Sequence, residues 1–252
     1  MKLHYKELGN GKPLIILHGL FGMLDNWLTP AKTLAENFRV ILVDQRNHGH
    51  SPHHSAFNYS DMSEDILELI HELDLDEVLV LGHSMGGKTA MKFAQHHPDY
   101  VEKLIVVDIG PKFYPIHHEV ILKGLNALDF SVVKTRAEAE KILSEFVPNS
   151  SERQFLMKNL YWIEKNKLAW RFNLGAITEQ INNVGEELFE RRFEKPVLFI
   201  KGQLSNYIKP EDGEGIRLVF PHTEIVEIPN AGHWVHAEQP QLFLKTVEEF
   251  LR

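Results

Sequence analysis

The chain has 252 residues, of which 43% are hydrophobic and 25% are charged, as in an ordinary globular protein, and its formal net charge is −8. This size suits one large domain, or one domain that carries an insertion. The negative charge argues against a nucleic-acid partner, because phosphate binding needs a basic surface. No apolar stretch is as long as a membrane span, and the first residues lack the apolar core of a signal peptide. We therefore expect a cytoplasmic protein without a membrane span.

Short apolar runs recur along the chain, with helical patterns between most of them. Continuous runs of this kind are typical of strands that are buried on both faces of a parallel sheet. They predict strands over residues 14–17, 40–43, 78–81, 104–107, 197–200 and 225–228. Helices are predicted over residues 28–36, 60–73, 88–97 and 241–250. The alternation indicates a doubly wound α/β fold with a mostly parallel central sheet and flanking helices.

This alternation stops between residues 111 and 195, where we find no convincing strand pattern. Helical patches are predicted there over residues 117–128, 136–146, 152–166 and 184–192. The stretch is crowded with aromatic residues, namely Phe113, Tyr114, Phe130, Phe146, Phe155, Tyr161, Trp162, Trp170 and Phe172. We interpret residues 111–195 as a helical cap, inserted into an α/β core of residues 1–110 and 196–252.

The pattern G-x-S-x-G occupies residues 82–86, directly after the predicted strand 78–81 and before the predicted helix 88–97. In this setting the pattern predicts a nucleophile elbow. A sharp turn from strand to helix forces the serine into a strained backbone conformation, and the two glycines prevent clashes across the turn. Ser84 is therefore the candidate nucleophile. The Met85 N–H, at the start of the helix, would point at a developing oxyanion.

A serine nucleophile needs a base, and the base needs an acid that orients it. At an elbow of this kind, the three residues follow one another in the order serine, acid, histidine. His233 is the candidate base, because it follows Gly232 in the loop after the last predicted strand. A loop at the carboxyl end of a strand is where a catalytic imidazole would face the serine.

The acid has two candidate positions. The loop after strand 197–200 carries Ser205 where a G-x-x-D pattern would place the acid. Asp108 ends the preceding predicted strand, and a carboxylate there can face the same cleft as the elbow. We favour Asp108, with Glu211 or Asp212 as the alternative, although Asp108 could also do no more than stabilise a turn.

The oxyanion hole needs a second backbone donor. The sequence His-Gly-Leu-Phe-Gly of residues 18–22 follows the first apolar strand, and its glycines allow a close approach to the serine. The Leu20 N–H is the first candidate for this donor and the Phe21 N–H is the second. A plain turn after a strand is the alternative interpretation.

The loop of residues 44–51 follows another predicted strand. We expect Asp44, Arg46 and Ser51 to hold the floor of the site together rather than to react, and Asn47 is suited to a positive φ. The nearby histidines could suggest a metal site: they are His48, His50, His53 and His54. No carboxylate cluster accompanies them, and the absence of cysteine excludes thiolate ligands, so we predict no metal.

These residues resemble the α/β-hydrolase superfamily over essentially the whole chain. The similarity is carried by His18-Gly19, the loop 44–51, the elbow 82–87 and Gly232-His233. More narrowly, the chain resembles the small YbfF-type esterases. The motifs that carry this narrower similarity are residues 18–22 with Asn26-Trp27, residues 44–49, residues 87–91 and residues 107–109.

The resemblance implies an esterase that acts on small acyl substrates, with acyl-CoA thioesters as a further substrate class and no cofactor. It also implies that Asp108 is the triad acid and that residues 205–207 lie near the substrate. The candidate substrate-binding residues are Phe21, Tyr114, Trp162, Ser205, Tyr207 and Trp234. Arg153 and Lys158 are candidates for a local basic site in the cap.

Other functions remain open at this stage. A carbon–carbon bond hydrolase or lyase would keep the serine, and a ligand-binding receptor could use the same scaffold. Haloalkane dehalogenation and epoxide opening on this fold need a carboxylate nucleophile, and Ser84 argues against both. The fold alone does not identify a substrate.

Overall fold

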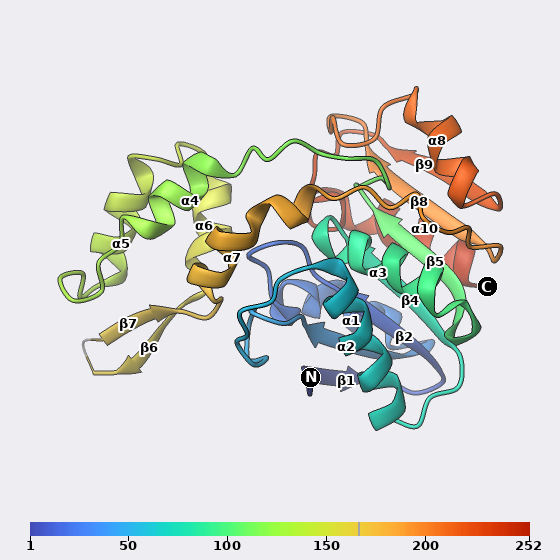
Figure 1. Ribbon diagram of the computed structural model, residues 1–252, viewed down its shortest axis with the longest axis horizontal. Coiled ribbons are helices and arrows are strands. Elements are labelled where there is room, and N and C mark those ends of the chain that lie inside the picture. Colours follow the sequence, from blue (N-terminus) through green and yellow to red (C-terminus); the bar gives the residue numbers. More distant parts are fainter. Residues whose placement is uncertain (166) are drawn as a thin grey trace.

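The structure is a computed structural model that describes residues 1–165 and 167–252. Its centre is a seven-stranded sheet in the order β1-β3-β2-β4-β5-β8-β9 (Figure 1). The pair β1 and β3 is antiparallel, and every other neighbouring pair is parallel. The strands are β1 (His4–Leu8), β2 (Lys12–Leu17), β3 (Phe38–Asp44), β4 (Val78–His83), β5 (Val101–Val107), β8 (Val197–Gly202) and β9 (Thr223–Ile228). The predicted α/β fold with a mostly parallel sheet is confirmed.

Helices cover both faces of this sheet. On one face pack α2 (Tyr59–Glu72), α3 (Met85–His96) and α8 (Asp212–Val219). On the other face pack α1 (Leu28–Leu34) and α10 (Pro240–Leu251). Three shorter helices lie in the connections, η1 (Leu24–Trp27), η2 (Pro98–Tyr100) and α9 (Val235–Glu238). None of the helices found in residues 1–165 and 167–252 has both the length and the apolar character needed to cross a membrane.

Strand β2 illustrates why the strands are continuous apolar runs. Successive side chains of a strand point to opposite faces of the sheet. Ile15 and Leu17 belong to the core under α2 and α3, whereas Leu14 and Ile16 belong to the core under α1 and α10. All four are at most 1% exposed. Because both faces are covered, neither can carry a polar side chain, and the sequence shows no alternation.

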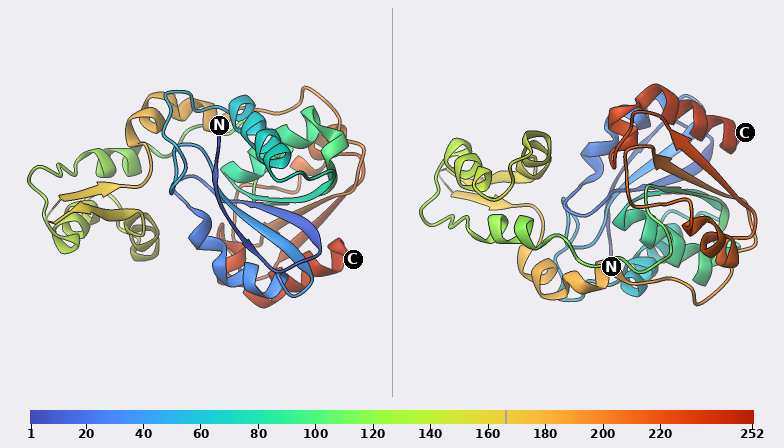
Figure 2. Two further views of the ribbon diagram at one scale, coloured as in Figure 1. Left: turned by 90° about the horizontal axis from the view of Figure 1, so that it is seen from below. Right: turned by 90° about the horizontal axis from the view of Figure 1, so that it is seen from above.

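The stretch between β5 and β8 forms a separate lobe beside the sheet, as Figures 1 and 2 show. Its elements are α4 (Glu119–Asn126), α5 (Arg136–Ser144), α6 (Ser150–Met157), β6 (Leu160–Glu164), β7 (Lys167–Trp170), α7 (Leu174–Gln180) and η3 (Ile181–Gly185). The buried apolar residues of this lobe form one cluster with Leu20, Phe21 and Met85 of the sheet-bearing part. The lobe, called the cap below, therefore packs next to the turn that carries Ser84. The boundaries 111 and 195 stay a prediction.

Three expectations for the cap were wrong. The stretch contains two strands, the antiparallel pair β6 and β7, in which Leu160 pairs with Trp170. The predicted helix 152–166 ends at Met157, and its last residue, 166, lies outside the described residues. The predicted helix 184–192 is absent, since residues 186–192 are irregular, and α7 was not predicted. Aromatic and β-branched residues such as those at 161–163 favour a pleated strand over the helix that their spacing suggested.

Candidate active site

Ser84 lies at the turn between β4 and α3, with φ 53° and ψ −119°. A positive φ is uncommon for a residue with a side chain and stores strain in the backbone. The two glycines of the motif make this turn possible. A Cβ on Gly82 would overlap the carbonyl oxygen of Gly86, and a Cβ on Gly86 would overlap the backbone of β2. The tight turn predicted from the motif is therefore present.

Asp108 and His233 form a hydrogen-bonded pair beside this turn. The Nδ1 of His233 donates to Oδ2 of Asp108 at 2.7 Å. The Asp108 side chain is fully buried, whereas that of His233 is 23% exposed. The carboxylate is further held by the Gly202 N–H at 3.1 Å and the Ser205 hydroxyl at 2.5 Å. Asp108 also has a positive φ of 52°. These contacts fix the orientation of the imidazole, which leaves Nε2 for other partners.

The alternative acids lie elsewhere. The carboxylate of Asp212 accepts from Lys112 Nζ at 2.6 Å and from the Lys209 N–H at 2.7 Å. Glu211 is exposed and directly precedes α8. The structure thus brings Asp108 to His233 and neither of these two residues. Ser205, at the position where a G-x-x-D pattern would place an acid, donates its hydroxyl hydrogen to the Asp108 carboxylate.

The backbone N–H groups of Leu20 and Met85 lie near Ser84 and line its cavities or begin its helix. Leu20 and Met85 donate no hydrogen bond to any part of the chain that the structure describes. The Phe21 N–H, in contrast, donates to Nε2 of His48 at 3.2 Å. Burial lowers the pKa of His48 to about 3, so its ring is neutral and can accept there. Leu20 and Met85 are therefore the candidate oxyanion donors, and Phe21 is not.

His83 ties the loop of His233 to the elbow. Its Nε2 donates to the backbone carbonyl oxygen of His233 at 2.8 Å. Burial lowers the pKa of His83 well below its usual value, so the ring stays neutral. The residue next to Ser84 thus fixes the position of the loop that carries the imidazole.

A cleft of about 230 Å³ opens beside Ser84 and His233. Its core side includes Leu20, Phe21, Tyr207 and Trp234. Its cap side is formed by His117, His118, Ile121, Glu152, Phe155 and Leu156. Sequence reasoning missed the cap residues as a cleft wall, because no local motif marks them. The only signal was the aromatic crowding that included Phe155.

The candidate substrate-binding residues are only partly brought together. Phe21, Tyr207 and Trp234 line the cleft. Tyr114 lines a smaller cavity of about 20 Å³, which Ser84 also lines. Ser205 contacts Asp108 instead. Trp162 lies on β6, is 46% exposed and is not part of the cleft wall formed by the described residues.

Two further predictions concern charged and metal-binding groups. The Arg153 guanidinium donates to the carbonyl oxygens of Val147 and Pro148, so it stabilises the fold of the cap itself. Among residues 1–165 and 167–252, no group of three or more histidine or acidic side chains is arranged to hold a metal ion.

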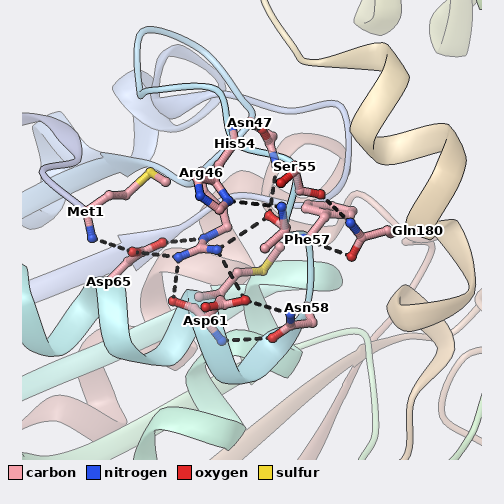
Figure 3. Close-up of polar contacts among 12 residues, drawn as sticks. Met1, Arg46, Asn47, His54, Ser55, Phe57, Asn58, Asp61, Asp65 and Gln180 are labelled. Carbon is pink, nitrogen blue, oxygen red and sulfur yellow. Dashed lines mark hydrogen bonds and ion pairs between the residues drawn. The ribbon is translucent and has the colours of Figure 1, made fainter.

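The floor of the site is held by the loop after β3. Arg46 forms two hydrogen bonds with Asp65, at 2.6 and 2.9 Å, and the N-terminal ammonium group of Met1 reaches the same carboxylate (Figure 3). Asp44 accepts from backbone N–H groups of Leu24 and His50. Asn47 has the expected positive φ of 65°. These contacts agree with the structural role that the sequence predicts for the loop.

A strained serine at a strand–helix turn, next to an Asp–His pair and under a helical cap, defines the class of α/β-hydrolases. Residues 12–155 match the family model described as the alpha/beta hydrolase fold, and the chain belongs to this family. It is 34% identical over 244 residues to the esterase YbfF of Escherichia coli, covering 96% of this chain and 94% of that protein. It is 37% identical over 247 residues to the sn-1-specific diacylglycerol lipase ABHD11 of Mus musculus, covering 94% and 80%. A solved structure of a marine microorganism esterase superposes with a TM-score of 0.97 at 43% identity, covering 99% of both chains.

Proposed function

We propose that the protein is a serine hydrolase of carboxylic esters that works through Ser84, His233 and Asp108. The observation that carries this proposal is the 2.7 Å hydrogen bond between His233 and the buried Asp108. His233 and Ser84 line the same cleft. The similarity to YbfF and to other ester hydrolases supports it.

In the first half of the reaction, the Ser84 hydroxyl oxygen attacks the carbonyl carbon of the ester. The Nε2 of His233 takes the hydroxyl proton, and Asp108 holds the imidazole in the required tautomer and stabilises its cation. The N–H groups of Leu20 and Met85 then stabilise the oxyanion. The tetrahedral intermediate collapses when the imidazolium protonates the leaving alcohol, and the acyl group stays on Ser84.

In the second half, water attacks the acyl-enzyme with His233 as the base. The second tetrahedral intermediate releases the carboxylic acid and restores the serine. Thioesters fit the same two steps, because a thiol is a better leaving group than an alcohol, so acyl-CoA thioesters are a second substrate class in this proposal. No cofactor takes part in either step.

The cap side of the cleft points to an apolar acyl group. Three of the six residues on the cap side of the cleft are apolar, namely Ile121, Phe155 and Leu156. An acyl chain that leaves water for such a wall gains roughly 0.8 kcal/mol for each buried methylene.

The test is a panel of p-nitrophenyl esters and acyl-CoAs with the purified protein, together with a fluorophosphonate probe. We expect ester turnover and covalent labelling of Ser84. Turnover of vinylogous diketones without ester turnover would favour a carbon–carbon bond hydrolase instead. Ligand binding that persists in Ser84→Ala, with no turnover in the parent, would favour a receptor.

A further inference from the structure

The proposed chemistry leaves one buried amino group unused, that of Lys88, and burial lowers its pKa to about 7. Lys88 lies on α3, four residues after Ser84, and its side chain is fully buried. A buried ammonium group is costly unless polar partners compensate it. The partners of Lys88 therefore indicate what the residue does.

The Lys88 ammonium binds both connections between the core and the cap. It donates to the carbonyl oxygen of Lys112, on the segment that enters the cap, at 2.7 Å. It also donates to the carbonyl oxygen of Glu186, on the segment that returns. The ring of Tyr114 lies 5.2 Å from Nζ and adds a cation–π contact. One side chain thus holds the two segments that carry the cap.

The two connections also bind each other above Lys88. The Tyr114 N–H donates to the carbonyl oxygen of Gly185 at 2.9 Å, and the Leu188 N–H donates to that of Pro111 at 2.7 Å. A Cβ on Gly185 would overlap the Tyr114 carbonyl oxygen, so the two segments are in close contact there. Any shift of one connection is therefore passed to the other.

The entering connection continues directly into the wall of the cleft. The Tyr114 hydroxyl donates to the carbonyl oxygen of Tyr207 at 2.7 Å. The Tyr207 hydroxyl and the Nε2 of His117 form a hydrogen bond at 2.8 Å. His117, His118 and Ile121 line the cleft beyond this point. The position of the wall relative to Ser84 thus depends on where the connection is held.

We propose that Lys88 is a positioning residue that fixes the cap on the core through one backbone carbonyl from each connection, and so sets the acyl selectivity of the cleft. Because α3 begins at the elbow, the same helix presents the Met85 N–H and holds the cap. This inference rests on the proposed ester hydrolysis for its kinetic part only.

Helix α3 also offers a matched control. Lys88, Lys92 and Gln95 are spaced so that they share one face of the helix, and all three are buried. Lys92 Nζ pairs with the Glu190 carboxylate at 2.9 Å, and Gln95 donates to backbone carbonyls of the returning connection. Of these three residues, only Lys88 donates a hydrogen bond to the entering connection among the described residues. Lys92→Met therefore removes a buried lysine from the same helix face and leaves the hydrogen bond from Lys88 to the entering connection in place.

The experiment compares Lys88→Met, Lys88→Arg and Lys92→Met with the parent. One readout is the ratio of kcat/KM for an octanoyl ester to that for an acetyl ester. The other is amide hydrogen exchange over residues 110–118 and 184–191, with β4 and β5 as internal reference. We expect Lys88→Met to lower the ratio by about tenfold, mainly through KM, since misplacing a binding wall costs such factors. Exchange in both connections should rise, whereas Lys88→Arg should restore both readouts in part and Lys92→Met should keep the ratio.

An unchanged ratio and unchanged exchange in Lys88→Met would overturn the proposal, and so would an equal loss in Lys92→Met. If Lys88→Met does not fold, Lys88→Gln takes its place in the same comparison, because glutamine keeps donor hydrogens on a shorter side chain. The same two outcomes then support or overturn the proposal. If the parent hydrolyses no ester, the proposed function fails, but the exchange pattern still tests whether Lys88 holds the cap.

Discussion

Tyr207 stacks on the imidazole of His233, with ring centroids 4.2 Å apart and ring planes 20° apart. The same tyrosine reaches His117 of the cap connection through its hydroxyl. Burial raises the pKa of Tyr207 to about 12, so the hydroxyl stays protonated. One side chain thus contacts the proposed base with its ring and the cap with its hydroxyl.

The two contacts of Tyr207 can be separated by substitution. Tyr207→Phe keeps the stack and removes the hydroxyl, so we expect kcat for an acetyl ester to fall less than about threefold. Tyr207→Ala removes the support of the imidazole, and we expect kcat to fall on the order of 10- to 100-fold. Steady-state kinetics on both variants checks this. Equal kcat in the two variants would show that the stack does not position the base.

Ser84→Ala should abolish hydrolysis while the fold is kept. Loss of a triad serine costs on the order of 10⁶ in kcat. Circular dichroism should match the parent, and fluorophosphonate labelling should disappear. Ser144→Ala is the control, because that hydroxyl donates to the Lys141 carbonyl oxygen on α5, away from the cleft. Activity of Ser84→Ala within tenfold of the parent would contradict the assignment of the nucleophile.

Asp108→Asn should lower kcat on the order of 10⁴-fold. An amide in place of the carboxylate favours the wrong imidazole tautomer and cannot stabilise the imidazolium. Asp212→Asn and Glu211→Gln are the controls, since these carboxylates do not contact His233, and both variants should stay within a few-fold of the parent. A collapse of turnover in either control, with Asp108→Asn active, would place the acid in the later loop.

The acyl chain should be bound by the cap side of the cleft. Each methylene that enters the cleft contributes roughly 0.8 kcal/mol, or about fourfold in kcat/KM, until the space is full. We expect a rising series from acetyl esters upward, and a flatter one in Phe155→Ala. Trp162→Ala, which changes an exposed ring on β6, should keep the parent series. A flat or falling series in the parent would reject an acyl pocket longer than a few carbons.

The buried histidines should make the fold sensitive to acid. Burial lowers the pKa of His18 and His118 to about 4 and that of His48 and His236 to about 3, from an ordinary 6.5. Well above pH 6.5 these rings are neutral in both the folded and the unfolded state. As the pH falls from 6.5 toward 4, the unfolded chain binds protons that the folded chain does not. The free energy of unfolding should then drop by about 1.4 kcal/mol per pH unit for each such ring.

Urea unfolding at pH 7.0, 5.5 and 4.5 measures this slope. His236 stacks on Trp27 at 4.0 Å, and a phenyl ring can keep that stack. His236→Phe should therefore reduce the slope by one proton, whereas His222→Phe, at an exposed position, should not. A free energy of unfolding that is constant from pH 7.0 to 4.5 would contradict the prediction.

The sequence predicted the parts of the site that local backbone geometry requires. The elbow around Ser84 needs glycine at residues 82 and 86. Asp108 is placed by its position at the end of a strand, which does not depend on a distant residue. The hydrogen bond between Asp108 and His233 follows from the order of strands in a parallel sheet. Such features depend on a few neighbouring residues, so the sequence predicts them directly.

The cleft wall could not be read in this way. Ile121 and Phe155 line the cleft because of how separate helices of the cap pack together, and no periodicity encodes that packing. The pair β6 and β7 was missed for a related reason, since a short aromatic run fits either a helix or a strand. Trp162, predicted to bind substrate, lies on that pair and is not in the cleft wall formed by the described residues.

The hydrogen bonds of Lys88 have a consequence for how much the sequence of the cap can vary between related proteins. Its acceptors are main-chain carbonyl oxygens of Lys112 and Glu186, and every amino acid provides such an oxygen. These two hydrogen bonds therefore place no demand on the side chains of Lys112 and Glu186. Related chains could exchange the residues that contact the acyl group, and thereby their substrates, while the anchor on α3 stays the same. Swapping whole caps between such proteins should succeed wherever the lysine and the path of the two segments are kept.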